Sequence, residues 1–136
     1  MNLFITTSRG VYNYNLINDN INQIIGNWHK GFFNKPSKGF FGISSNMNQN
    51  ELIFASREKL SKNINYEKSS DSIVYFYNIL KRKFTKKIVV KNLFDIHQIT
   101  FFDNFVFLTE TGKNRIQVLN ILNSKIDFFI NIGDIR

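Results

Sequence analysis

The residue types best suited to chemistry are a carboxylate and an imidazole two positions apart, at Asp95 and His97. Residues i and i+2 of a β-strand point to the same side, so a strand here would bring the two groups together. A carboxylate beside an imidazole can orient the ring as a general base or as a metal ligand. The alternative is that His97 only hydrogen-bonds a neighbouring structural unit.

The other histidine, His29, lies in an irregular stretch that also holds the only Trp and the only Pro of the sequence. If both histidines line one channel mouth, then His29, Asp95 and His97 form a tentative ligand-binding set that would suit a divalent metal. Three ligands on separate segments are a sparse signal, so we expect no bound cofactor and keep a divalent metal as the alternative. No catalytic residue is identified, because a Ser–His–Asp order, a Gly-rich phosphate loop and zinc-ligand spacing are all missing. The sequence has no cysteine, which excludes disulfides and thiolate metal sites within it.

Five basic residues flank Phe84 and form a candidate basic patch: Lys81, Arg82, Lys83, Lys86 and Lys87. Such a patch could contact RNA phosphates, with nearby aromatic side chains stacking on bases. We favour a simpler interpretation, in which the charges belong to a solvated hairpin and protect a sheet edge from pairing. The net charge of +8 adds little, because 13 of the 18 basic residues are Lys, as the A/T-rich codons of a low-G+C genome would produce. RNA is therefore a disfavoured partner.

The elements that must position these residues are β-strands. No stretch of a dozen residues keeps the i, i+3, i+4, i+7 apolar spacing of an amphipathic helix. The apolar runs are short, rich in Ile, Val, Phe and Tyr, and separated by Asn, Asp, Gly and Ser. Several runs, such as Ile73–Leu80, are nearly continuous, which indicates strands that are covered on both faces. Sheets stacked around an axis meet this requirement better than a sandwich with one solvated face.

The strands recur as a repeated unit. Aligned on Ile5, Ile53 and Phe107, the spacing is 48 and then 54 residues. Periods of roughly 40–50 residues with four strands per unit are typical of β-propeller blades. The predicted fold class is all-β and β-propeller-like, with three four-stranded antiparallel blades, of which the first lacks its inner strand, in an incomplete ring. The predicted strands are Leu3–Thr7, Val11–Leu16, Ile21–Ile25, Phe40–Ser44, Glu51–Ser56, Ile73–Ile79, Phe84–Val90, Ile96–Phe101, Phe105–Thr109, Ile116–Ile121 and Lys125–Ile132.

The predicted organisation is a single partial propeller domain over residues 1–136, with blades at approximately 1–26, 39–91 and 95–133. Three blades cannot close a ring in the usual way, and their open sides would expose apolar surface. We expect a fragment or split gene, a six-bladed ring made from two copies, or a surface that covers a partner. The expected partner is accordingly a second propeller half or a second copy.

The segment Thr109–Val118 (TETGKNRIQV) resembles the core of an NHL-type repeat. The family pattern Asp-Thr-Gly-Asn-x-Arg-Ile follows a strand, and here Glu110 replaces the usual Asp. Gly42 and Ile43 are similar to the Gly-Ile of the family's opening strand. The resemblance implies a six-bladed, NHL-like propeller superfamily. It implies no specific activity, because that superfamily includes lyases, lactonases, receptors and RNA-binding modules.

Three residues of this segment are expected to fix its turn: Glu110, Asn114 and Arg115. A guanidinium beside Glu110 and Asn114 can bridge the turn and reach the backbone of an adjacent blade through several fixed donors. A ligand contact by Arg115 is the alternative.

A scaffold pattern without a complete catalytic set predicts a non-catalytic propeller module that binds a small-molecule or protein ligand. The alternative is an NHL-like lyase or hydrolase with a His/Asp metal site near the axis. The N-terminal segment lacks the pattern of a signal peptide, and no segment approaches the ~18 apolar residues that span a membrane. We therefore expect a cytoplasmic protein without a membrane partner.

Overall fold

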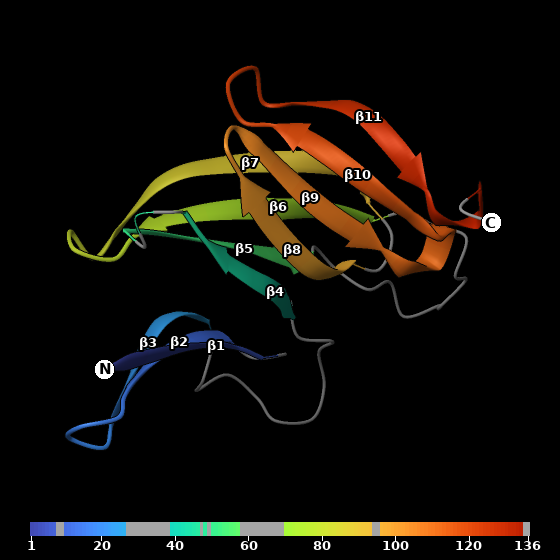
Figure 1. The fold of residues 1–136 in the computed structure, drawn as a ribbon. Coiled ribbons are helices and arrows are strands. Elements are labelled where there is room, and N and C mark those ends of the chain that lie inside the picture. Colours follow the sequence, from blue (N-terminus) through green and yellow to red (C-terminus); the bar gives the residue numbers. More distant parts are fainter. Residues whose placement is uncertain are drawn as a thin grey trace.

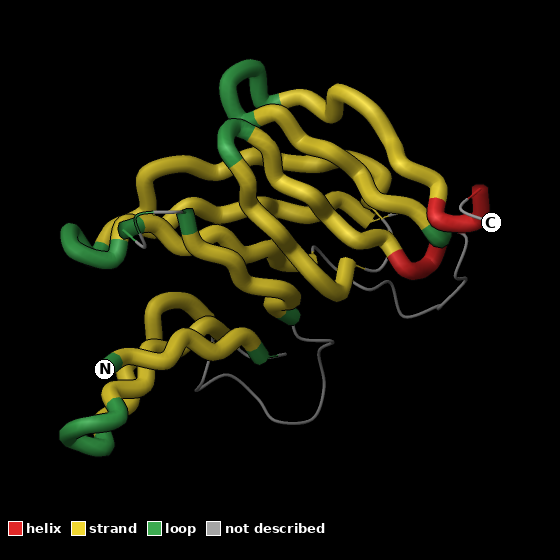
Figure 2. The backbone as a smooth tube through the Cα atoms, in the orientation of Figure 1, coloured by secondary structure: helices red, strands yellow, loops and turns green. Residues whose placement is uncertain are grey.

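The computed structural model describes residues 1–7, 10–26, 39–46, 48, 50–57, 70–93 and 96–134. Within these ranges the chain forms three antiparallel sheets (Figures 1 and 2). The first sheet contains β1 (Asn2–Thr6), β2 (Gly10–Asn15) and β3 (Asn20–Gly26). The second sheet contains β4 (Phe40–Ser45), β5 (Glu51–Arg57), β6 (Ser70–Asn78) and β7 (Lys83–Leu93). The third sheet contains β8 (Ile96–Phe102), β9 (Phe105–Glu110), β10 (Arg115–Asn120) and β11 (Lys125–Asn131), with short 3-10 turns η1 (Thr111–Lys113) and η2 (Ile132–Asp134).

The predicted fold class is confirmed, including the first sheet with three strands. Each predicted strand overlaps an observed one, because β-branched and aromatic runs are separated by residues that tolerate tight turns. Asp19, Asp103 and Asn114 adopt the left-handed conformation at such turns, with φ of 50°, 53° and 49°. Asn and Asp accept this conformation more readily than other non-glycine residues.

The second sheet is buried on both faces, which explains its continuous apolar runs. One face packs against the third sheet in a cluster that includes Ile53, Val74 and Phe76. The opposite face packs against the first sheet around Phe54 and Tyr75. Successive residues of β6 therefore enter different clusters, as the two-residue period of a strand requires.

The strands β4 and β8 lie close together at Gly42, where the pairing of β4 with β5 is irregular. Gly42 has φ of +63°, and a Cβ atom there would lie 2.7 Å from the backbone nitrogen of Ile99. Nearby, the backbone N–H of Phe101 donates to Ser44 Oγ at 3.1 Å. Only glycine satisfies both the positive φ and this close approach.

Gly42→Ala is therefore expected to destabilise the protein by about 2 kcal/mol or more, through backbone strain and displacement of β8. Chemical denaturation followed by circular dichroism measures the change. Gly133→Ala is the matched control, because no atom lies within 4 Å of its Cβ position. Equal stability of the two variants would contradict the close approach of β4 and β8.

The structure shifts the repeat alignment by one residue in the first sheet. The side chain of Phe4 packs towards the second sheet, as Ile53 packs towards the third. The equivalent positions are therefore Phe4, Ile53 and Phe107, and Ile5 was the wrong anchor. Leu3, Phe4 and Ile5 are all apolar, so the side-chain pattern alone could not set the register.

Candidate interaction surface

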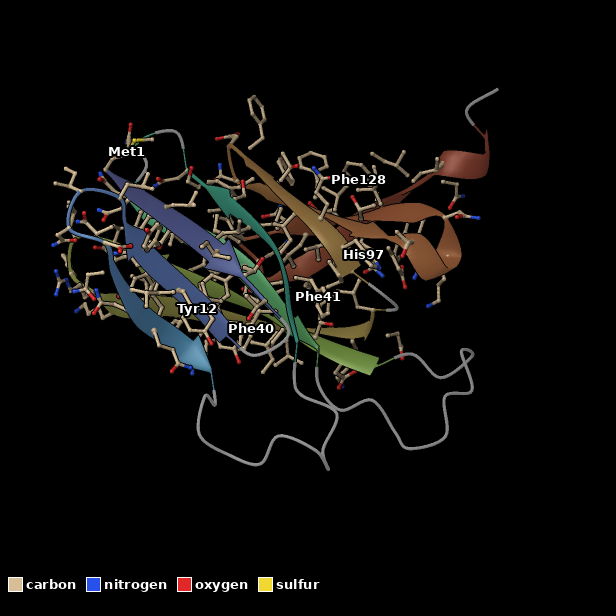
Figure 3. All side chains as sticks on the ribbon, turned by 90° about the horizontal axis from the view of Figure 1, so that it is seen from below. Met1, Tyr12, Phe40, Phe41, His97 and Phe128 are labelled. Carbon is tan, nitrogen blue, oxygen red and sulfur yellow. The ribbon has the colours of Figure 1, made fainter. Side chains whose placement is uncertain are left out.

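His97 is the second residue of β8, as the prediction of an inner-strand position requires. The pairing of β8 with β9 is irregular between Ile96 and Gln98, so His97 lies at a bulge. Its side chain is exposed, and its ring lies 6.0 Å from the ring of Phe41 on β4 (Figure 3). His29 and Asp95 fall outside the described residues, so the convergence of the three side chains stays a prediction. In the part of the chain that the structure describes, no three His, Asp or Glu residues gather into a metal-binding group.

The five residues of the candidate basic patch lie in three different environments. Lys81, Arg82 and Lys83 are exposed at the hairpin between β6 and β7. Lys86 donates to the carbonyl oxygen of Ile121 and so reaches the third sheet. Lys87 lies 5.5 Å from the ring centres of Tyr75 and Phe84, on the opposite face of its sheet. The five residues therefore do not form one continuous basic surface, and the hairpin tip holds three of them.

Glu110 is fully buried at the end of β9, and three cationic or polar side chains contact its carboxylate. Its Oε2 atom accepts from Arg115 Nε at 2.5 Å and from Gln117 Nε2 at 2.7 Å. Its Oε1 atom lies 3.3 Å from Lys113 Nζ, which also donates to the backbone oxygen of Asn92 in the second sheet. The predicted reach to an adjacent sheet is thus made by Lys113, a residue that the sequence did not single out.

The Arg115 guanidinium itself stays within the third sheet. It stacks 4.3 Å above the ring of Phe129 on the neighbouring strand β11. Asn114 holds the turn through its backbone, because its carbonyl accepts from the N–H of Ile132 at 2.8 Å. The side chains of Glu110 and Arg115 and the backbone of Asn114 therefore hold the turn at one end of the sheet.

A larger feature that the sequence did not reveal is the far face of the third sheet, which points away from the second. The strand registers place seven apolar residues on this face: Phe102, Phe105, Phe107, Ile116, Val118, Phe128 and Ile130. Phe102 is 61% exposed and Phe128 is 50% exposed. Figure 3 shows Phe128 in the third sheet, well away from Tyr12 in the first. We call these seven residues the open face.

The equivalent face of the second sheet shows how such a surface is normally covered. There, Ile53, Ala55, Val74, Phe76, Ile88 and Val90 pack against the third sheet and are at most 4% exposed. When the two sheets are matched strand by strand, Ile53 is equivalent to Phe107 and Phe76 is equivalent to Val118, since Ile53 lies opposite Phe76 and Phe107 lies opposite Val118. On the open face, by contrast, Phe102 and Phe128 are exposed, Phe105, Phe107, Ile116 and Ile130 are half-buried, and only Val118 is fully buried. Partly exposed apolar surface of this extent marks an interaction site in soluble proteins.

On the far face of the first sheet, which points away from the second sheet, the cross-strand pairs resemble those on a covered face of the second sheet. Leu3 lies opposite Tyr14, and Ile5 lies opposite Tyr12. In the second sheet, Leu52 lies opposite Tyr77 and Phe54 opposite Tyr75, on the face that the first sheet covers. Leu3 is 48% exposed. Tyr12 is only 6% exposed, so the exposed part of this far face lies around Leu3 and Tyr14.

The hairpin between β2 and β3 holds an ionisable side chain whose pKa is shifted. Its hydroxyl donates to Asp19 Oδ1 at 2.5 Å, and this hydrogen bond raises the pKa of Tyr14 above its usual value. The pair lies at the hairpin between β2 and β3, in a different sheet from His97.

Comparisons with known proteins identify the fold. No family model matches the chain, and no curated protein matches it. A chain in the crystal structure of a nidogen/laminin complex is similar over 96% of this chain, with 12% identity and a TM-score of 0.61. The Dos1 propeller is similar over 92%, with 16% identity and a TM-score of 0.62. The three sheets therefore have the fold of a β-propeller segment.

This chain spans only 43% and 28% of the lengths of those two structures. The three sheets thus correspond to part of each matched chain. Among the described residues, no helix has the length and hydrophobicity to cross a bilayer.

Proposed function

We propose that this chain is a non-catalytic interaction module that forms half of a six-bladed, NHL-like propeller, and that its open face docks a second copy. The observation that carries the proposal is the open face itself. Its counterpart in the second sheet is buried by a sheet of the same repeat, so the natural cover for the open face is another such sheet.

A second copy offers that cover. Its first sheet has a far face on which Leu3 lies opposite Tyr14, and this pair matches Leu52 and Tyr77 on the covered face of the second sheet. With two-fold symmetry, the open face of each copy meets the first sheet of the other, and the assembly closes. The seven residues of the open face are apolar, and polar groups border them at one end, where Asn120 lies opposite Phe105 and Lys125 and donates to Asp127 Oδ2 at 2.8 Å.

The ring would place β4 and β8 near its axis, and a ligand-binding role for His29, Asp95 and His97 belongs to this proposal. His97 and Phe41 would then border the axial region from neighbouring sheets. The ligand class that the exposed imidazole and aromatic ring support is a small molecule or a protein side chain.

The test is the double substitution Phe102→Ser/Phe128→Ser. The wild-type chain is expected to dimerise at tens of micromolar, and the variant to need at least about tenfold more protein, because interface aromatic residues typically contribute more than 1 kcal/mol each. Sedimentation velocity across a concentration series measures this.

The matched control is Leu80→Ser/Leu122→Ser, which removes two turn residues that are 76% and 75% exposed. We expect this control to dimerise like the wild type. A monomeric wild type, or equal effects of both double variants, would overturn the proposal.

A further inference from the structure

The first strand, β1, has one pairing edge with no strand beside it among the described residues. β1 pairs with β2 only, and the first sheet has the order β1-β2-β3. The N–H of Thr7 donates to Gly10 and the N–H of Leu16 donates to Met1, which fixes the alternation of the ladder. In an antiparallel pair, alternate residues bond the partner strand and the others point outward. The backbone N–H and C=O groups of Asn2, Phe4 and Thr6 therefore point to the open edge.

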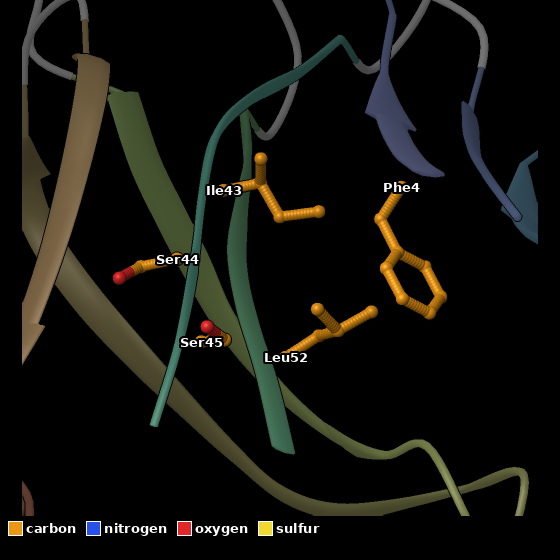
Figure 4. Close-up of a pocket in the computed structure, with 5 residues that line it drawn as sticks. All are labelled: Phe4, Ile43, Ser44, Ser45 and Leu52. Atoms are coloured by element: carbon orange, nitrogen blue, oxygen red, sulfur yellow. The ribbon is translucent and has the colours of Figure 1, made fainter. Parts of the chain in front are cut away.

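A hollow of about 410 Å³ lies beside this edge, between β1 and the second sheet. It is lined by Phe4, Ile43, Ser44, Ser45 and Leu52. Figure 4 shows Phe4 facing Ile43 and Leu52 across the hollow, while Ser44 turns the other way, towards the third sheet. The open edge thus adjoins a space walled by side chains of both sheets.

The second and third sheets show what occupies the same position. β4 pairs with β5 there, and β8 pairs with β9. The residue opposite Ile53 is Ser44, and the residue opposite Phe107 is Thr100. The preceding residues, Ile43 and Ile99, lie opposite Phe54 and Leu108. Both inner strands therefore place Ile and then a small hydroxyl residue at equivalent positions.

We propose that the open edge of β1 binds an extended strand of a partner protein, antiparallel to β1, with Ile opposite Ile5 and Ser or Thr opposite Phe4. The added strand makes main-chain hydrogen bonds with Asn2, Phe4 and Thr6, which is the β-augmentation mode of recognition. Its alternate side chains, on the side of Phe4, point towards the hollow between the two sheets. The inference rests on the proposed role as an interaction module, but it uses the edge of the first sheet rather than the open face.

The probe is a fluorescein-labelled peptide with the sequence of β8, Ile96–Phe102, followed by lysines for solubility. By the register of β8 on β9, the N–H groups at the Thr100 and Phe102 positions donate to the neighbouring strand, whereas those at the Ile99 and Phe101 positions point away. N-methylation at the first pair of positions should weaken binding by at least about tenfold, since it removes two main-chain hydrogen bonds. N-methylation at the second pair is the matched control and should leave affinity nearly unchanged.

The protein side is tested with Thr6→Pro, which deletes one outward N–H on an edge strand, against Thr6→Val, which keeps it. Fluorescence anisotropy should show weaker binding to Thr6→Pro than to Thr6→Val. Undetectable binding to the wild type, or equal effects of the two methylation patterns, would overturn the inference, and the methylated peptides decide the question even if Thr6→Pro does not fold. Sedimentation of Phe102→Ser/Phe128→Ser reports separately on the open face, so the two proposals fail independently.

Discussion

Phe54→Ala is expected to lower the free energy of unfolding by about 3–5 kcal/mol. Phe54 is fully buried between the first and second sheets. Its ring stacks on Tyr75 with 5.5 Å between centroids and meets the edges of Phe40 and Phe84 at 6.1 and 6.3 Å. Truncation to alanine removes these contacts and leaves a cavity in the cluster that joins the two sheets.

Urea denaturation followed by circular dichroism measures this effect, with Leu80→Ala as the control. Leu80 is 76% exposed in a turn, so its truncation should change stability by less than about 0.5 kcal/mol. If Phe54→Ala cost less than about 1 kcal/mol, the packing of the first sheet on the second would be contradicted.

Glu110→Gln is expected to destabilise the protein by about 3 kcal/mol. Removing one partner of a buried ion pair typically costs about 3–5 kcal/mol, because the remaining charge is left uncompensated. The lower end applies here, since the Arg115 side chain is 22% exposed and water can solvate part of its charge. The glutamine keeps the size of the side chain, so the loss reports on charge rather than on a cavity.

A double-mutant cycle with Arg115→Met separates the pair from its surroundings. The double variant should be less destabilised than the sum of the two single variants, because no unpaired guanidinium remains. Strict additivity would show that Glu110 and Arg115 do not stabilise each other.

The sequence predicted the strands well because each one is a local pattern. Runs such as Phe105–Glu110 combine high β-propensity with a turn residue at each end, here Asn104 and the Thr111–Lys113 turn. The repeat then predicted three sheets, with three strands in the first and four in each of the others. These predictions use only the order of residues along each strand and the spacing of the repeat.

The relations between sheets could not be predicted in the same way, because they depend on contacts between distant residues. Lys86 and Lys87 are adjacent in sequence, yet Lys86 reaches the third sheet while Lys87 lies over Tyr75 and Phe84 on the other face of its own sheet. The sequence around them does not show which of the two faces the third sheet. In β9, Phe107 and Leu108 are both apolar, so the pattern cannot tell the covered face from the open one. The second sheet is covered on both faces, with Ile53 towards the third sheet and Phe54 towards the first. Matching Phe107 to Ile53 and Leu108 to Phe54 shows which face of the third sheet is covered.

The most direct test of the central claim, that the open face is covered by a second copy, is the protection of a thiol placed on it. The chain lacks cysteine, so a single reporter can be introduced at Thr100, an exposed residue opposite Phe107 on this face. A second reporter at Leu122, in a turn that is 75% exposed, serves as the control. As protein concentration rises, we predict that modification of Thr100→Cys slows by at least about tenfold while that of Leu122→Cys stays constant, as expected when docking excludes water from an interface core. Equal and concentration-independent rates at both positions would contradict the account.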